Sequence, residues 1–317
     1  MHTLTLLELK RRRREADTPA VSASTRLGGQ AVIEGVMVRY GPRWAVAARR
    51  PDGTIATHRA AVPAWAGALR KVPVVRGTVA LASTIGLGMQ ALSWSRSVAD
   101  GDKPQSRGSV AAAATLSVVV FVTIFALAPA AVARLVAEDG WLFAVTEAVV
   151  RLALFVGYIA AIGRLPGIRR TFEYHGAEHQ AIAAAEAGLR GPNAMVGDAL
   201  TVEHVRTYSP RHARCGTDFM VLVAVVAVFA FALVAPHSWL LLAVSRVLLL
   251  PVVAGLAYEI LRVSDRPGVS RWLKPVMVPA MAVQRLTTRT PTDDQVEVAI
   301  VAVQTALAGT NAEAPAP

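Results

Sequence analysis

The pattern of apolar and polar positions changes several times along the chain. In the amino-terminal part, short β-prone runs alternate with turn residues, the runs being residues 31–38, 44–48 and 54–60. Pro51-Asp52-Gly53 between the last two is typical of a β-turn, because Pro fixes φ and Gly accepts a positive φ. The pattern therefore predicts a small antiparallel β element over residues 25–62.

Further along, four segments carry about twenty consecutive apolar residues, which is the length that crosses a bilayer as a helix. These segments are residues 110–133, 141–163, 219–235 and 238–258. Two are expected to form helices 1 and 2 of a membrane domain (110–163), and two to form helices 3 and 4 (218–262). An earlier apolar stretch, interrupted by glycines, predicts an interfacial or re-entrant helix within residues 63–98, followed by a polar linker at 99–109.

The two ends of the chain have different patterns. Thr292-Asp293-Asp294-Gln295 has the form of a capping box, and Val296, Ile300, Val303 and Leu307 then recur at helical spacing. This predicts an amphipathic helix within a cytosolic segment, 263–309, docked on the rest of the protein and followed by a disordered tail at 310–317. Residues 1–24, with a run of basic side chains, are expected to form a disordered arm.

Composition supports a membrane protein, because 54% of the 317 residues are hydrophobic and the mean hydropathy is +0.43. Seventeen Lys and Arg precede residue 110, seven lie between 164 and 216, and six follow Tyr258; Arg134, Arg151 and Arg246 complete the 33. Because positive loops stay inside, both termini and the loop 164–217 are expected in the cytosol. A further span near residue 80 would export the basic amino-terminal region and is excluded. The net charge of +11 thus has a topological origin and argues against a nucleic-acid partner.

The strongest chemical motif is His175-Gly176-Ala177-Glu178-His179, in the loop between the second and third predicted spans. On a helix the two histidines are one turn apart, so both imidazoles reach one divalent ion, while Glu178 accepts a proton from a water on the metal. This is the inverted zinc-hydrolase pattern. We therefore expect a divalent metal, with zinc as the first choice, bound by His175 and His179.

The remaining ligands are open at this stage. Cys215 and His212 lie in the same loop with the spacing of a metal-ligand pair, and Cys215 beside arginines is a candidate thiolate. Cys215 alone leaves one position for water, whereas His212 in addition closes the site and makes it structural. Carboxylate candidates are Glu34, Glu203 and Glu259. Cys215 is the single cysteine, which excludes a disulfide within the chain.

Charged residues also occur inside the predicted spans. Glu147 and Arg151 are four residues apart in the second span, and Arg246 lies midway along the fourth. Charge within a bilayer is expensive, so these residues are expected to face the bundle and to pair. The alternative is a conduit for an ion or a lipid headgroup.

Three ordered motifs resemble the YqhQ-like family of bacterial membrane proteins of unknown function. They are residues 28–37 (Gly-Gly-Gln-Ala-Val-Ile-Glu-Gly-Val-Met), 172–179 (Phe-Glu-Tyr-His-Gly-Ala-Glu-His) and 214–217 (Arg-Cys-Gly-Thr). Ala213 stands where relatives often carry a proline. The resemblance implies a bacterial inner-membrane protein and a metal-dependent enzyme.

Together these features predict a mainly α, polytopic membrane protein with four transmembrane helices and a small cytosolic antiparallel β element. The function expected first is a metal-dependent hydrolase at the cytosolic membrane face, with Glu178 as general base. Its substrate would be a peptide or a lipid-linked group, and membrane lipid is the expected partner. The alternative is a non-catalytic membrane scaffold or regulator whose metal is structural.

Overall fold

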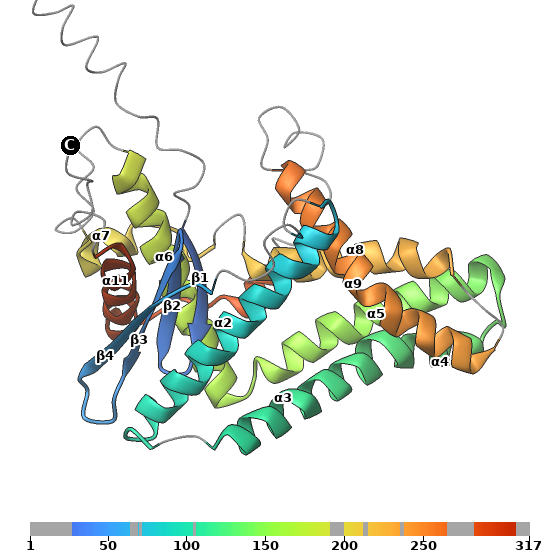
Figure 1. Ribbon diagram of the computed structural model, residues 1–317, viewed down its shortest axis with the longest axis horizontal. Helices are drawn as coiled ribbons and strands as arrows, with labels where there is room; N and C mark the ends of the chain where they lie inside the picture. Colours follow the sequence, from blue (N-terminus) through green and yellow to red (C-terminus); the bar gives the residue numbers. More distant parts are fainter. Residues whose placement is uncertain are drawn as a thin grey trace, which may run out of the picture.

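The protein is mainly helical and has one four-stranded sheet near its amino terminus (Figure 1). The computed structural model describes residues 27–63, 69, 72–103, 106–190, 200–211, 215–234, 238–264 and 282–308. The sheet is an antiparallel meander in the order β1 (Leu27–Val32), β2 (Gly35–Tyr40), β3 (Arg43–Arg49) and β4 (Ile55–Ala61). The predicted antiparallel β element is thus confirmed. The expected basic arm, 1–24, and tail, 310–317, lie outside the described residues and stay predictions.

One strand boundary was predicted wrongly. Residues 31–38 were expected to form one run, but Ile33 and Glu34 form a two-residue turn in which Val32 pairs with Gly35. Glu34 has a φ of 51°, and a Cβ at Gly35 would collide with the carbonyl of Ala47 on the neighbouring strand. The apolar run hid this turn because strand residues continue directly on both sides of it.

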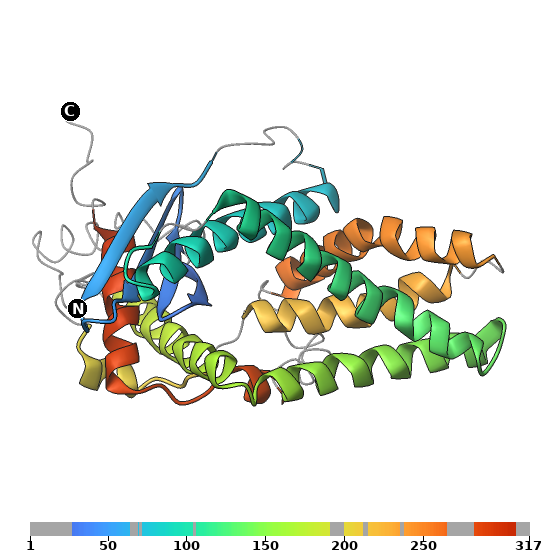
Figure 2. The same ribbon diagram turned by 90° about the horizontal axis from the view of Figure 1, so that it is seen from below.

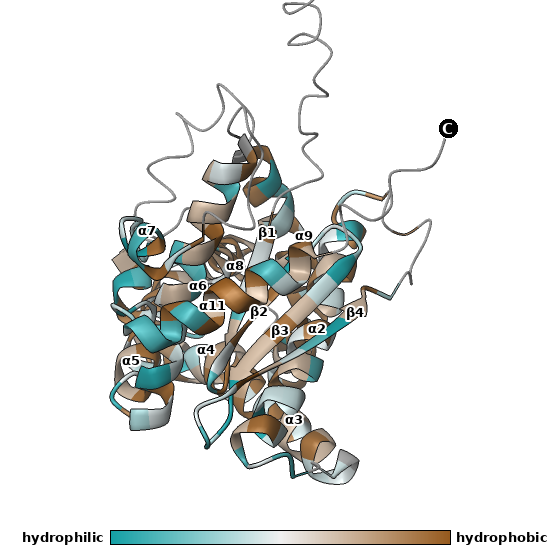
Figure 3. Cartoon of the chain, turned by 90° about the vertical axis from the view of Figure 1, so that its left-hand side faces the viewer, coloured by the Kyte–Doolittle hydropathy of each residue, from teal (hydrophilic) through white to brown (hydrophobic). Residues whose placement is uncertain are grey.

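Helices cover both faces of the sheet, so the amino-terminal domain has three layers. Helices α6 (Pro166–Arg190) and α11 (Asp293–Leu307) cover one face, and α2 (Val75–Ala99) covers the other (Figures 1 and 3). Along β2 the side chains alternate accordingly: Val36 and Val38 pack with α6 and α11, and Met37 packs with Leu87 of α2. Hydrophilic residues remain on the outward side of β4 and on the short helix α7 (Val202–Arg206) (Figure 3).

Helix α11 begins with the predicted capping box, in which the Thr292 N–H donates to Gln295 Oε1 at 2.9 Å. It is more deeply buried than a one-sided amphipathic helix. Besides the predicted stripe residues Val296 and Val303, Val298 and Ala302 are fully buried, because α11 packs against both the sheet and the neighbouring α6. The carboxyl-terminal helix is therefore part of the core of the amino-terminal domain.

A bundle of long apolar helices extends away from this domain (Figure 2). Three helices are long and apolar enough to cross a membrane: Gly108–Val136, Gly140–Ile162 and Trp239–Val263. The first consists of α3 (Arg107–Val122), the π-helical turn η2 (Thr123–Leu127) and α4 (Ala128–Arg134) in succession. The second is α5 (Gly140–Ile162), and the third is α9 (Trp239–Ser264). Their exposed surfaces carry large apolar side chains, among them Leu116, Val149 and Leu248. Such a surface suggests a membrane protein.

The predicted third span is a shorter helix, so four full-length spans are not present in the described residues. Helix α8 (Gly216–Ala232) has 17 residues, or roughly 26 Å, against a hydrocarbon core of about 30 Å. It packs against α9, which corresponds to the predicted fourth span.

Glu147, Arg151 and Arg246 form a buried cluster at the centre of the bundle, as predicted from their charge. Arg246 Nε and Nη2 donate to the two Glu147 oxygens, each at 2.9 Å, and Arg151 Nη2 donates to Oε1 at 2.5 Å. Both guanidinium groups also lie over the Phe231 ring, at 4.6 and 4.7 Å from its centroid. The exposures are 2% for Glu147, 4% for Arg151 and 0% for Arg246.

The same arginines satisfy backbone carbonyls that the apolar helices leave open. Pro129 has no N–H to offer the carbonyl of Phe125, four residues earlier, and Arg151 Nε donates to that oxygen at 3.1 Å. Arg246 Nη1 donates to Val234 O at 2.6 Å, just beyond the carboxyl end of α8. Arg246 thus binds a carbonyl that follows the last turn of α8 inside the apolar bundle.

Candidate metal centre

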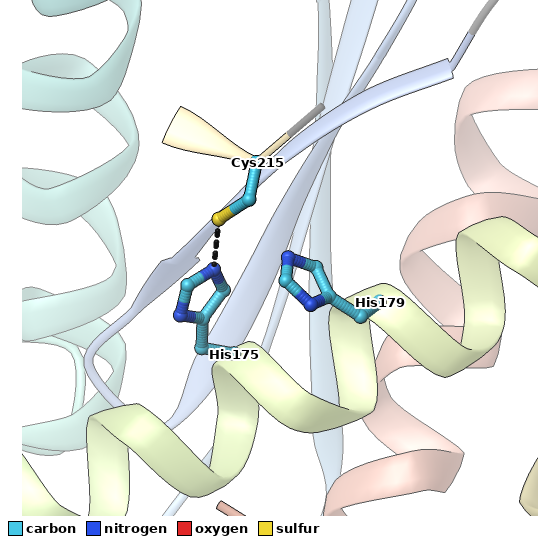
Figure 4. Close-up of side chains that lie close together, drawn as sticks. All are labelled: His175, His179 and Cys215. Carbon is cyan, nitrogen blue, oxygen red and sulfur yellow. Dashed lines mark hydrogen bonds between the residues drawn. The ribbon is translucent and has the colours of Figure 1, made fainter. Parts of the chain in front are cut away.

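His175 and His179 project from the same side of α6 toward the start of α8 (Figure 4). Their rings are 4.4 Å apart between centroids, as expected for residues one helical turn apart. Gly176 allows α6 to approach the chain at Arg289, because a Cβ there would collide with the Arg289 carbonyl. The Arg289 N–H also donates to Phe172 O at 3.0 Å. Close backbone packing thus fixes the helix under the two histidines.

Backbone carbonyls hold both rings in one tautomer. His175 Nδ1 lies 2.9 Å from Thr287 O, and His179 Nδ1 lies 2.7 Å from Pro210 O. A carbonyl only accepts, so each Nδ1 carries the proton and each Nε2 keeps its lone pair. This is the arrangement that prepares an imidazole for metal binding through Nε2.

Cys215 completes the cluster from a different part of the chain. It immediately precedes α8, and its Sγ lies 3.0 Å from His175 Nε2. The ligand atoms of Cys215, His175 and His179 all lie within 4.8 Å of one another. A thiol at a helix amino terminus is stabilised as the thiolate, which is the form that binds a metal.

Glu178 lies beside the cluster with its Oε2 4.0 Å from His175 Nε2. It is 5% exposed, and burial raises the pKa of this carboxyl from 4.5 to about 8; His175 opposes this rise, and Cys215 adds to it. Its side chain lies against the backbone of β1, because a Cβ at Gly29 would lie 2.7 Å from Glu178 Cδ. Gly29 therefore sets the position of the carboxylate.

The three carboxylates considered as further ligands lie at other places. Glu34 forms an ion pair with Arg170 and accepts from the Tyr174 hydroxyl at 3.3 Å. Glu203 is exposed in the first turn of α7. Glu259 forms an ion pair with Arg76. Among the described residues the structure thus brings together His175, His179 and Cys215, with Glu178 beside them; His212 lies outside the described residues.

Several supporting residues were missed at the sequence level. Gly29 lies within β1, although the sequence showed it only as part of the motif at residues 28–37. A glycine inside a strand often marks a close approach of another group, and this signal was available. Thr287 and Pro210 act through backbone oxygens, which every residue type has, so the sequence gives no sign of their role.

The donor set fits a zinc-type ion. Two imidazole nitrogens and one thiolate sulfur are ligands that zinc prefers, and both imidazoles have the outer hydrogen bond that metal-binding histidines show. The chemistry of these residues is therefore consistent with the predicted metal.

Comparison with known proteins gives the family. The model described as "Protein of unknown function (DUF1385)" matches residues 72–309. The chain belongs to this DUF1385 family. A relative, "Uncharacterized protein YqhQ" of Bacillus subtilis (strain 168), is 32% identical over an alignment of 297 residues, and the alignment covers 86% of this chain and 89% of that protein. The resemblance seen in the three sequence motifs is confirmed. No solved structure matches the chain.

The DUF1385 match includes the whole candidate centre, since His175, His179 and Cys215 all lie between residues 72 and 309. It begins after the sheet, so Gly29 and Glu34 lie before it. The relative covers a longer part of the chain.

Proposed function

We propose that the protein is a metal-dependent hydrolase, with zinc as the metal, acting at the cytosolic face of a bacterial inner membrane. The observation that carries the proposal is the convergence of His175, His179 and Cys215, with the Glu178 carboxylate 4.0 Å from His175. Three protein ligands and one position left for water are the pattern of hydrolytic rather than structural zinc sites.

The residues divide the chemical work between them. When bound, the metal would lower the pKa of a water molecule and polarise the bond to be cleaved. Glu178 is the general base: it takes a proton from the attacking water on its carboxylate and passes it to the leaving group. Gly29 leaves the space that this carboxylate occupies against β1, while Thr287 and Pro210 keep the imidazoles in the binding tautomer.

The membrane arrangement is part of the proposal. We place α3 to α4, α5, α8 and α9 in the bilayer, with α8 as a short fourth span whose end is completed by Arg246. The distribution of Lys and Arg then puts both termini and the candidate centre on the cytosolic side. The junction between bundle and sheet domain, where Cys215 meets α6, would lie at the membrane surface.

Substrate would approach from the side of β1. This strand is at the edge of the sheet, and its Gly28 and Gly29 are exposed next to Glu178. A peptide or a lipid-linked group at the membrane surface could reach the carboxylate there without crossing the core.

A second candidate function is favoured by the burial of the centre. His179, Glu178 and Cys215 are 3%, 5% and 6% exposed, as in a metal site that only folds the protein. With such a site, the chain would be a membrane scaffold or regulator, and Glu178 would support a ligand.

Glu178→Gln separates the two functions. The change keeps size and much of the hydrogen bonding but removes the base, whose help typically contributes 10² to 10⁴-fold in rate. We expect normal zinc content in the purified protein and no complementation of a strain lacking the gene. Glu203→Gln, on the exposed face of α7, is the matched control and should complement.

Two results would contradict the hydrolase. Full complementation by Glu178→Gln with full zinc content would remove the need for a base. Loss of zinc in parallel with loss of complementation would instead support the structural site, because loss of an outer-shell partner weakens metal binding by roughly 10 to 100-fold.

A further inference from the structure

A buried polar pair lies at the start of α8, three residues beyond Cys215. Asp218 is in the first turn of α8, and Gln284 lies in a helical turn at residues 282–287. Gln284 Nε2 donates to Asp218 Oδ1 at 2.9 Å, and both residues are 0% exposed. Neither side chain is among the ligand atoms of the candidate centre. The pair joins two segments that are 66 residues apart in the sequence.

The pair belongs to a closed ring of contacts that includes two of the candidate ligands. On one side, the Asp218 N–H donates to Cys215 O at 3.0 Å, so both residues belong to one helical turn. On the other side, the Thr287 hydroxyl donates to Gln284 O at 3.4 Å, and Thr287 O accepts from His175 Nδ1 at 2.9 Å. His175 Nε2 and Cys215 Sγ, 3.0 Å apart, close the ring (Figure 4).

The segment that carries Gln284 is fixed to α6 by contacts of its own. The Thr288 N–H donates to Gln284 O at 2.8 Å, which ties the end of the turn together. In the next residue, the Arg289 N–H donates to Phe172 O at 3.0 Å, and the Arg289 carbonyl lies against Gly176 of α6. A bond to Gln284 therefore attaches α8 to the helix that carries both histidines.

The surroundings of the pair are apolar. Val221, one turn beyond Asp218 on α8, belongs to a buried cluster with Phe155. Leu286, two residues beyond Gln284, packs against the same cluster. A buried carboxylate and a buried amide are costly in such a place unless they bind a partner. Their bond adds a fixed distance and direction, because a hydrogen bond weakens steeply when its geometry changes.

A metal centre requires such a fixed distance. Zinc binds sulfur at about 2.3 Å and imidazole nitrogen at about 2.0–2.1 Å, and a sound site keeps these distances to within about 0.2 Å. The two histidines are placed by one helix and by the carbonyls of Thr287 and Pro210. Cys215 comes from another part of the chain, so its place depends on how α8 is attached to α6.

We propose that Asp218 and Gln284 are positioning residues that hold Cys215 in place as the third ligand of the metal centre. This role rests on the proposed function, since it requires a metal bound by His175, His179 and Cys215. The pair acts through the first turn of α8 and touches neither the metal nor the substrate. Without the bond the two histidines still bind the metal, but the sulfur does not reach it.

The test uses cobalt in place of zinc in the purified full-length protein, because a thiolate on cobalt gives a near-ultraviolet charge-transfer absorption. Asp218→Leu combined with Gln284→Met removes the bond and replaces both partners by apolar side chains of similar size, a change that is often nearly neutral for stability. We expect the thiolate–cobalt absorption to be lost and the cobalt affinity to fall about 10 to 100-fold. The melting temperature of the metal-free protein should stay unchanged.

Three single variants separate the bond from general stability. Asp218→Leu alone should give the same loss of absorption as the double variant. Asp218→Asn keeps an oxygen that accepts from Gln284 and should retain the absorption. Gln295→Met is the matched control, because it breaks a buried bond of the same kind, from Gln295 Nε2 to Glu173 Oε2 at 3.1 Å. It should retain the absorption although it lowers the melting temperature.

Undiminished thiolate–cobalt absorption in the double variant would overturn the role of the pair. Loss of the absorption in Asp218→Asn would do so too, since the bond is kept there, and so would an equal loss in Gln295→Met. Failure of the wild-type protein to bind cobalt would overturn the metal centre and the proposed function together. Normal cobalt binding by the wild-type protein with an unaltered double variant would overturn the positioning role alone.

Discussion

Glu147→Gln should destabilise the protein severely, because Glu147 is the described carboxylate that binds both buried arginines. Removing its charge leaves two guanidinium groups, 4% and 0% exposed, facing each other across an amide. Breaking a buried ion pair by removing one partner costs about 3–5 kcal/mol. At roughly 2–4 °C per kcal/mol for a chain of this size, the melting temperature should fall by about 6–20 °C.

The assay is thermal unfolding of the purified protein in detergent, followed by circular dichroism. Two controls test whether charge is the cause. Glu297→Gln breaks the Arg49 pair at the surface, where Glu297 is 54% exposed, and should change stability by less than about 1 kcal/mol. Arg151→Met leaves Glu147 bound to Arg246 by two 2.9 Å bonds and brings the cluster to neutrality. It should therefore cost less than Glu147→Gln, and an equal or larger cost would refute the argument from charge.

Three further predictions follow from the centre, the topology and the carboxyl-terminal helix. Purified protein should contain about one zinc per chain by elemental analysis, and His175→Ala or His179→Ala should lose it, whereas retention of zinc in both variants would place the metal elsewhere. For the topology, single cysteines are placed in a Cys215→Ser background. Glu203→Cys should react with a thiol reagent only after the reagent enters the cytosol, whereas Leu135→Cys, 87% exposed between α4 and α5, should react from outside the cell. The reverse labelling pattern would mean that the topology is inverted. Thr292→Ala should lower the free energy of unfolding by about 1 kcal/mol through loss of the cap, measured by chemical denaturation, with Thr305→Ala beyond the cap as a comparison.

The parts of the fold that the sequence predicted best are those with a local cause. Apolar length identified the long helices, and the motif Thr292 to Gln295 identified the start of α11. The histidine pair followed from helical spacing alone. Each of these depends on residues within a few positions of each other.

The errors have non-local causes. The turn at Ile33 and Glu34 is fixed by Gly35 meeting β3, which no local pattern shows. The burial of α11 on more than one side arises because sheet and α6 both pack on it, although only one apolar stripe was apparent.

The same reasoning explains why the ligand set was open. Cys215 was one of several candidate ligands until the start of α8 brought it 3.0 Å from His175.

Gly29→Ala tests whether the backbone of β1 positions Glu178. In a strand, Gly to Ala is ordinarily favourable by roughly 0.5–1 kcal/mol, since Gly loses the most freedom on folding. At Gly29 the added methyl would lie 2.7 Å from Glu178 Cδ, so the buried carboxylate must move away from its place 4.0 Å from His175. At Gly28, the preceding residue of the same strand, an added Cβ meets nothing within 4 Å. We therefore expect Gly28→Ala to complement a strain lacking the gene and Gly29→Ala to fail. Gly29→Ala should keep its zinc, because the three atoms nearest to the new methyl all belong to Glu178 and none to His175, His179 or Cys215. If both variants complement equally, the position of Glu178 against β1 has no part in function, and the proposal that this carboxylate is a positioned base is wrong.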